Sequence, residues 1–234
     1  RVWHSSTGHF SAAAHTAELV DDPGRPPGYT ESAMSEPTPS IRAHYPPTVP
    51  RAAKKVLPAL DDHMQAFIAL SPFLCLGTSA SSGADVTPRG DSPGFVQVVD
   101  GTTLLVPDWP GNNRLDSLVN IEQNPEIGLL FFVPGVNETL RVNGNAAITR
   151  DPAVLGRWRV NGKQPRSVLR VTVREAFLHC GKALIRSRLW DSATQVPRTA
   201  LPTYGQMLKD QTKIEDTAEQ IEASLQDGYK NRLY

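Results

Sequence analysis

Short apolar runs separated by turn residues fill the middle of the chain. Glycine, proline, asparagine and aspartate make up the connectors, which favour tight turns between neighbouring antiparallel strands. Because few helical segments interrupt the series, the pattern predicts a mainly β fold with flanking helices, built as an antiparallel barrel or sandwich. The runs expected to form strands are 73–79, 85–90, 95–99, 103–107, 127–133, 139–148 and 167–180.

Helical spacing of apolar residues marks the segments around these strands. One helix is expected from about Arg51 to Leu70, where Pro58 fits only in a first turn, so that the helix could begin nearer Val56. The remaining helices are expected over 113–123, 152–160, 182–189 and 203–227.

Three regions follow from these patterns. Residues 1–50 include a stretch rich in proline, glycine, serine and glutamate, so we expect a largely irregular N-terminal extension. Residues 51–202 form the folded domain. Residues 203–234 form a polar amphipathic helix, which we expect to pack on the domain or on a dimer partner.

Composition narrows the possible functions. The 234 residues include 24 Lys+Arg and 24 Asp+Glu, and this zero net charge argues against a general nucleic-acid binder. It leaves room for a local basic pocket that holds an anionic small molecule. The sequence has no apolar run long enough for a membrane span, and its first residues lack a signal-peptide pattern. With two cysteines, Cys75 and Cys180, in apolar segments, we expect a cytoplasmic protein without a disulfide framework.

The segment LLVPDWPGNNRLDSLVNIEQNP, residues 104–125, carries the clearest candidate chemistry. A strand ends at Asp108, and a turn leads into a helix that is expected to begin at Arg114. Asn112 or Asn113 could cap this helix, and a helix N-terminus with a forked guanidinium suits a phosphate. The segment is therefore either a phosphate cradle or an ordinary capped helix with an exposed arginine.

The octet TPRGDSPG, residues 87–94, allows two interpretations. Arg89-Gly90-Asp91 is the tripeptide that integrins bind, which would suit an exported adhesion protein. Alternatively, Arg89 lies on a strand of the barrel and meets the same anion as Arg114 and Arg141.

Four runs together carry a family resemblance, which covers roughly residues 50–210. PRGD, PGNNRLDSL, ETLRVNG and HCGKALIRSRLW occur here in the order typical of pyridoxamine 5′-phosphate oxidase-like proteins. The chain most resembles a bacterial branch of these FMN-binding split-barrel proteins. The resemblance implies an antiparallel split β-barrel, built as a homodimer with FMN at the subunit interface.

The resemblance also implies a set of cofactor-binding residues. Thr87, Pro88, Arg89 and Gly90 would run beside the flavin ring and phosphate chain, and Asp108 would lie near the ring edge. Asn112, Asn113 and Arg114 would hold the phosphate. Thr139 and Arg141 would come from the next strand, of the same or of the partner subunit, and Arg186 and Trp190 would close the site.

The implied function is two-electron oxidoreduction of a small molecule through a tightly bound FMN, with no residue required as general acid or base. The chain lacks the Arg-Leu-rich ending of pyridoxamine phosphate oxidases, and Asn113-Arg114 replaces their Arg-Lys pair, so vitamin B6 oxidation is not expected. The alternative is a non-catalytic flavin, haem or deazaflavin carrier or sensor. His179-Cys180 has no second pair at ligand spacing, so no metal site is expected.

Overall fold

The computed structural model describes residues 40–234, and most of the expected N-terminal extension therefore lies outside the described residues. The chain divides at Pro47 into two compact units. In the first, the described part contains a 3₁₀ turn, Ile41–His44. The second unit, Thr48–Tyr234, contains the sheet and the candidate site.

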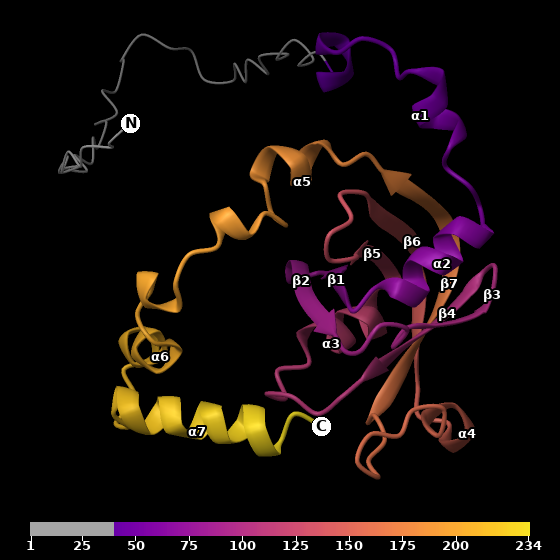
Figure 1. The fold of residues 1–234 in the computed structure, drawn as a ribbon. Helices are drawn as coiled ribbons and strands as arrows, with labels where there is room; N and C mark the ends of the chain where they lie inside the picture. The colour runs from indigo at the N-terminus through magenta and orange to yellow at the C-terminus, as the bar shows by residue number, and fades with distance from the viewer. Residues whose placement is uncertain (1–39) are drawn as a thin grey trace, which may run out of the picture. The chain divides into compact units, whose positions relative to one another are not determined.

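One seven-stranded sheet forms the centre of the second unit, and every ladder in it is antiparallel (Figure 1). The strand order is β2-β1-β5-β6-β7-β4-β3, which leaves β2 and β3 as the two edges. All seven expected strands are present, with bounds that shift by one or two residues. They are β1 Phe73–Ala80, β2 Gly83–Gly90, β3 Gln97–Asp100, β4 Thr103–Asp108, β5 Glu126–Phe132, β6 Thr139–Thr149 and β7 Ser167–His179.

The sheet curls into an open barrel around a single large core. Buried residues from β1, β4, β5, β6 and β7 belong to one apolar cluster, which includes Leu74, Phe131 and Val171. In a flat sheet, β2 and β4 would lie five strand spacings apart, about 24 Å. Arg89 of β2 nevertheless forms an ion pair with Asp108 of β4, so the sheet must curl until these strands meet. This open antiparallel barrel with flanking helices confirms the expected split-barrel fold class.

The single helix expected over residues 51–70 was wrong. The structure has α1, Pro50–Lys54, and α2, Asp62–Leu70, with an extended segment between them. In that segment Leu57 forms a β-bridge with Ala176. Asp61 then begins α2 by accepting a hydrogen bond from the Met64 amide at 2.8 Å. Pairing with β7 therefore overrides the helical spacing of the apolar residues.

The C-terminal helix expected over residues 203–227 is two helices, α6 Tyr204–Thr212 and α7 Ala218–Asn231. Lys213 ends α6 in the left-handed conformation, and Thr217 starts α7 with a capping box. The other helices are shorter than expected. They are α3 Asp116–Gln123, α4 Pro152–Leu155 and α5 Lys182–Ser187, followed by 3₁₀ turns at Ser192–Thr194 and Arg198–Ala200.

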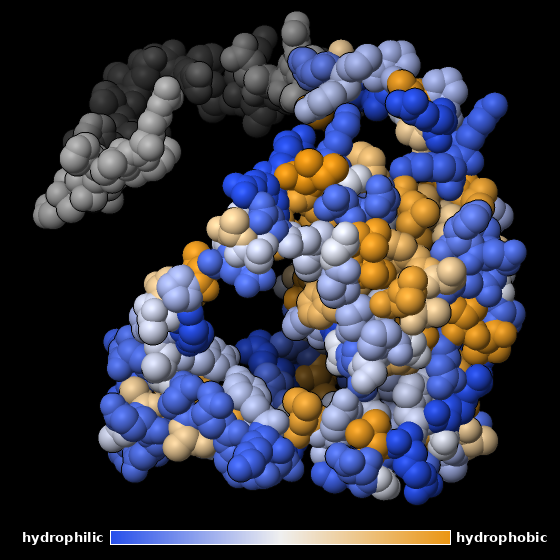
Figure 2. Space-filling model, in the orientation of Figure 1, coloured by the Kyte–Doolittle hydropathy of each residue, from blue (hydrophilic) through white to orange (hydrophobic). Residues whose placement is uncertain are grey.

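The surface of the second unit mixes charged and apolar side chains (Figure 2). Both cysteines are free thiols, and Cys180 is exposed although its apolar segment suggested burial. Among residues 40–234, no helix is long and apolar enough to cross a membrane.

Gly144 allows β6 and β7 to approach closely where their register shifts. A Cβ atom at this position would lie 2.1 Å from the Thr172 carbonyl oxygen. We expect Gly144→Ala to lower the free energy of unfolding by about 3 kcal/mol, because backbone must move to admit the methyl group. Urea denaturation measures this loss. Gly101→Ala, with its nearest neighbour at 3.5 Å, is the control and should change stability by less than about 1 kcal/mol. Equal stabilities would contradict the packing argument.

Candidate functional site

The turn after β4 has an unusual backbone. Asn113 and Leu115 both have positive φ, 61° and 60°, and Leu115 is the N-cap residue of α3. A left-handed leucine costs roughly 1–2 kcal/mol, so the surrounding contacts must hold this turn in place. Asn112 contributes one such contact, because its Oδ1 accepts a hydrogen bond from the Arg114 amide at 3.1 Å.

The expected helix cap was therefore wrong. The helix begins at Asp116 rather than Arg114, and neither Asn112 nor Asn113 caps it. Both asparagine residues are exposed in the turn that precedes α3. Their amide groups can donate to a ligand, which is the role that the family resemblance implies for them.

Arg114 extends from this turn into solvent, with 75% of its side chain exposed. Its Nε donates to Asp116 Oδ2 at 2.8 Å, and this hydrogen bond raises the pKa of the guanidinium. Within residues 40–234, the two terminal nitrogens of Arg114 have no recorded partner. They form the half of the guanidinium fork that can meet an anion.

Arg89 lies opposite this turn, where the edge strand β2 meets β4. Its Nη1 donates to Asp108 Oδ1, and the two side chains are only 22% and 13% exposed. The Nε of Arg89 is buried and has no hydrogen-bond partner among the described residues. A buried donor without an acceptor is costly, which indicates that a ligand with an acceptor oxygen belongs beside it.

A chain of hydroxyl groups joins β2 to α3 on the same side of the barrel. Ser117 Oγ donates to Asp85 Oδ2 at 3.1 Å and lies 2.9 Å from Thr87 Oγ1. Because Ser117 has only one hydroxyl proton, Thr87 must be the donor in their contact. Thr87 therefore presents only lone pairs to the cavity and can accept a hydrogen bond from a ligand.

These groups line one cavity of about 510 Å³, a size typical of small-molecule sites. It brings together seven of the residues expected to bind a cofactor, namely Thr87, Pro88, Arg89, Asp108, Asn112, Asn113 and Arg114. Gly90 is the next residue along β2, but its Cα faces Phe73 and Pro72.

The sequence analysis missed several residues that line the cavity. Trp109 and Arg166 both line the cavity, as do Asp85 and Ser117 on either side of Thr87. The Arg166 amide donates to the Asp108 carbonyl oxygen at 2.9 Å, which ties the start of β7 to the end of β4. Only the register of these two strands reveals this proximity. The sequence offers a signal only for Trp109, because it is an aromatic residue directly after the expected strand end at Asp108.

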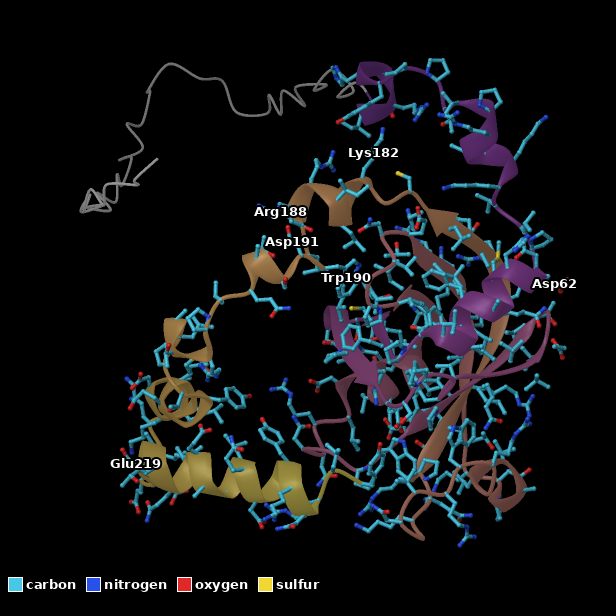
Figure 3. All side chains as sticks on the ribbon, in the orientation of Figure 1. Asp62, Lys182, Arg188, Trp190, Asp191 and Glu219 are labelled. Carbon is cyan, nitrogen blue, oxygen red and sulfur yellow. The ribbon has the colours of Figure 1, made fainter. Side chains whose placement is uncertain are left out.

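Thr139, Arg141, Arg186 and Trp190 do not line this cavity. Thr139 and Arg141 lie on β6, which is separated from β2 by β1 and β5. Arg186 is exposed on α5. Trp190 follows α5 beside the Arg188–Asp191 ion pair, and its Nε1 donates to the Val136 carbonyl oxygen at 2.8 Å (Figure 3).

A cationic cluster surrounds the ring of Phe177 at the end of β7. Arg141 and Lys55 each lie 5.4 Å from the ring centroid, and the His179 ring lies 4.9 Å away. Burial, followed by the charges of Arg141 and Lys55, lowers the pKa of His179. The Nε2 of His179 is buried without a partner among the described residues.

The Arg-Gly-Asp tripeptide is not displayed for another protein. Arg89 is paired with Asp108 inside the barrel, and Asp91 accepts hydrogen bonds from Trp109 Nε1 at 3.1 Å and from Tyr234 Oη at 2.7 Å. Both charged ends of the tripeptide are thus engaged within the chain, which argues against the adhesion interpretation.

The cavity of the open barrel has the size of a small-molecule site, and its donors suit an acceptor-rich, anionic ligand. Residues 60–180 match the family model described as pyridoxamine 5′-phosphate oxidase, just over half of the chain. The chain belongs to this family. No curated protein matches it.

Solved structures similar to this chain share little sequence with it. HupZ of Group A Streptococcus is 19% identical, with 51% of this chain and 93% of that chain covered and a TM-score of 0.42. An FMN-binding protein from Syntrophomonas wolfei is 12% identical, with 50% of this chain and 83% of that chain covered and a TM-score of 0.40. A Clostridium acetobutylicum protein related to general stress protein 26 is 15% identical, with 51% of this chain and 90% of that chain covered and a TM-score of 0.39. These values are too low to carry an argument.

The Arg89–Asp108 pair should matter for stability. Arg89→Met leaves a mostly buried carboxylate without its partner, so we expect a loss of about 3 kcal/mol in the free energy of unfolding. Asp108→Leu in the same chain should recover part of that loss, because both charges are then gone. Urea denaturation of the two single variants and the double variant measures the coupling. If the double variant loses as much stability as the two single variants combined, the pair does not hold the barrel together.

His179 should make stability depend on pH. Its pKa is lower in the folded protein than in the unfolded chain, so protonation favours unfolding. Its contribution is fully present above the unfolded pKa of about 6.5 and is lost as pH falls toward the folded pKa. We expect His179→Gln to reduce the stability difference between pH 7.5 and pH 5.5, measured by urea denaturation. An unchanged difference would contradict this assignment, with His63→Gln as the control.

Proposed function

We propose that the chain binds FMN in the cavity between β2 and the turn after β4 and acts as an FMN-dependent oxidoreductase on a small molecule. The observation that carries the proposal is the buried Arg89 Nε without a partner among residues 40–234. FMN offers carbonyl, ribityl and phosphate oxygens, each of which can satisfy that donor. Membership of the pyridoxamine 5′-phosphate oxidase family supports FMN as the ligand.

Two ion pairs in the cavity determine which side-chain groups stay available to the cofactor. Asp108 is paired with Arg89 and Asp116 with Arg114, so neither carboxylate faces an anion uncompensated. The free terminal nitrogens of Arg114 and the amides of Asn112 and Asn113 would hold the phosphate. Thr87, whose hydroxyl proton is directed to Ser117, would accept a hydrogen bond from the flavin ring.

The protein's contribution to catalysis would be positioning rather than proton transfer. Bound flavin supplies two-electron redox chemistry at its ring. The polar groups that line the cavity are two arginine–carboxylate pairs, the Asp85 carboxylate, Arg166, amides and hydroxyls, which can bind and orient a cofactor. This arrangement supports an enzyme that binds, orients and shields the flavin.

A homodimer would complete the site. Thr139 and Arg141 lie three strand spacings from β2, about 14 Å across the sheet, so within one subunit they do not meet the cavity. The neighbouring strands β1 and β2 expose apolar side chains that a second subunit could cover, including Phe73 at 39% and Val86 at 68% exposure. We propose that Thr139, Arg141, Arg186 and Trp190 reach the flavin of the partner subunit.

The decisive test of the phosphate site is Arg114→Ala. We expect it to raise the Kd for FMN by at least about tenfold, because it removes a charge-assisted contact to the phosphate. Riboflavin lacks the phosphate, so its Kd should hardly change. Quenching of flavin fluorescence measures both constants.

Arg150→Ala is the matched control, since Arg150 is exposed and lies outside the cavity. An equal effect of Arg114→Ala on FMN and riboflavin would contradict the phosphate assignment. Turnover of the FMN-loaded protein with a reduced nicotinamide and an electron acceptor separates an oxidoreductase from a flavin carrier or sensor. A haem or deazaflavin spectrum in the purified protein would exclude FMN as its cofactor.

A further inference from the structure

Positive charge is concentrated in one segment of this neutral chain. The segment, residues 150–170, runs from the end of β6 through α4 into β7 and contains a single acidic residue, Asp151. Asp151 is already engaged as the N-cap of α4, where it accepts a hydrogen bond from the Ala153 amide at 2.9 Å. The basic residues of the segment are Arg150, Arg157, Arg159, Lys163, Arg166 and Arg170.

Trp158 fixes this segment on the sheet. Its buried ring packs with Leu105 and Val168 in a second, small apolar cluster. Its Nε1 donates to the Phe95 carbonyl oxygen at 2.9 Å, so the indole is held by packing and by a hydrogen bond. The positive charges around it are therefore carried by a fixed surface.

Four arginine residues on this surface have no partner of their own. Arg157 and Arg159 flank the buried indole and are exposed, and Arg170 lies opposite Leu105 in the ladder of β4 and β7. Arg150 is exposed directly before α4. Among residues 40–234, none of these guanidinium groups has a hydrogen bond or an ion pair. We call the four residues the basic face.

Negative charge is concentrated in the hairpin formed by α6 and α7. Residues 210–227 contain a single basic residue, Lys213, and the acidic residues Asp210, Glu215, Asp216, Glu219, Glu222 and Asp227. Glu215 and Asp216 lie in the turn between the helices and have no partner in the described part of the chain. Glu219 is in the first turn of α7 (Figure 3). We call these last three residues the acidic end of the hairpin.

The acidic end is held away from the basic face of its own chain. α7 has 14 residues and is therefore about 21 Å long. The chain beyond its C-terminal end reaches the basic segment, where Lys163 Nζ donates to the Tyr234 carbonyl oxygen at 2.5 Å, and the acidic end lies at the opposite end of the helix (Figure 1). No ion pair joins residues 150–170 to residues 210–227 within the described range.

The hairpin also makes few contacts with the barrel. α6 and α7 pack against each other, and with other helices and strands they make at most isolated contacts. Gly205 permits the close packing, because a Cβ atom there would lie 2.4 Å from the Ala218 carbonyl oxygen. The hairpin is thus a separate element that presents its carboxylates to solvent.

We propose that the basic face binds the acidic end of the hairpin from a second copy of this chain. Each copy carries both surfaces, so a two-fold axis pairs them reciprocally. Exposed ion pairs contribute little singly, and we therefore expect a weak contact that salt dissociates. The contact needs no FMN and is separate from the proposed flavin interface, because it involves neither β1 nor β2.

Nucleic acid is the other polyanion that suits a basic face. The observations favour a second copy, because the chain has zero net charge and its own acidic hairpin would repel a phosphate backbone. The same hairpin supplies the complementary charge when two copies meet.

Zero-length cross-linking of mixed copies tests the proposal. Arg159→Lys keeps the charge of the basic face and supplies an amine that a carbodiimide can join to a carboxylate. An equal mixture of unlabelled and ¹⁵N-labelled copies of this full-length variant is cross-linked, digested and measured by mass spectrometry. We expect peptides that join residue 159 of one isotope to residues 215–219 of the other.

Charge reversal shows whether the basic face is responsible. In the Arg159→Lys chain, adding Arg157→Glu and Arg170→Glu should lower the yield of mixed-isotope peptides at least about tenfold. Salt at about 1 M should act in the same direction, because it shortens the Debye length to about 3 Å. Arg51→Glu with Lys54→Glu, which reverses two exposed cations of α1, is the matched control and should leave the yield unchanged. Circular dichroism checks that each variant is folded.

The outcomes decide the proposal independently of FMN. Mixed-isotope peptides that need Arg157 and Arg170 would support it, even in a protein that takes up no flavin. Only single-isotope peptides, no cross-link at residue 159, or an unchanged yield after charge reversal would overturn it. A DNA duplex that binds through Arg157 and Arg170, without mixed-isotope peptides, would assign the basic face to nucleic acid and overturn it as well.

Discussion

The ion pair between Arg89 and Asp108 is the contact on which this structure depends. It joins the edge strand β2 to β4, two strands that lie five positions apart in the sheet order, and it does so where both side chains are largely shielded from solvent. A charge placed there requires its partner, since an unpaired buried carboxylate or guanidinium is costly. The pair therefore joins the two sides of the curled sheet, and the curl places β2 opposite the turn that precedes α3.

That constraint also explains why the candidate site lies where it does. An open barrel has edges, and the cavity at its seam lies beside the backbone turn after β4. One terminal nitrogen of Arg89 donates to Asp108, and its buried Nε has no hydrogen-bond partner among the described residues. The structural contact and the proposed binding contact thus come from the same side chain. The left-handed Leu115 and Asn113 at the opposite wall store backbone strain that fits a ligand-holding turn.

The sequence predicted the secondary structure well wherever residues within one segment determine it. The strand bounds differ from expectation by one or two residues, because turn residues separate the apolar runs. It failed where distant residues decide. Leu57 pairs with Ala176 in place of the helix expected there, and the left-handed Lys213 divides one expected helix into two.

The site shows the same limit. The family resemblance and the segment 104–125 predicted that Thr87 to Arg89 and Asn112 to Arg114 would meet. Both stretches do line the same cavity. Arg166 could not, since only the register between β4 and β7 brings it there. Thr139 and Arg141 remain predictions, because in the proposed homodimer they would meet residues of the partner subunit.

FMN binding is tested most directly by a titration of the purified protein with FMN, followed by the fluorescence of the flavin. We expect saturable binding of about one FMN per chain, with the flavin fluorescence changed by its move from water into the cavity. A protein that is colourless as purified and shows no saturable change on addition of FMN would contradict it.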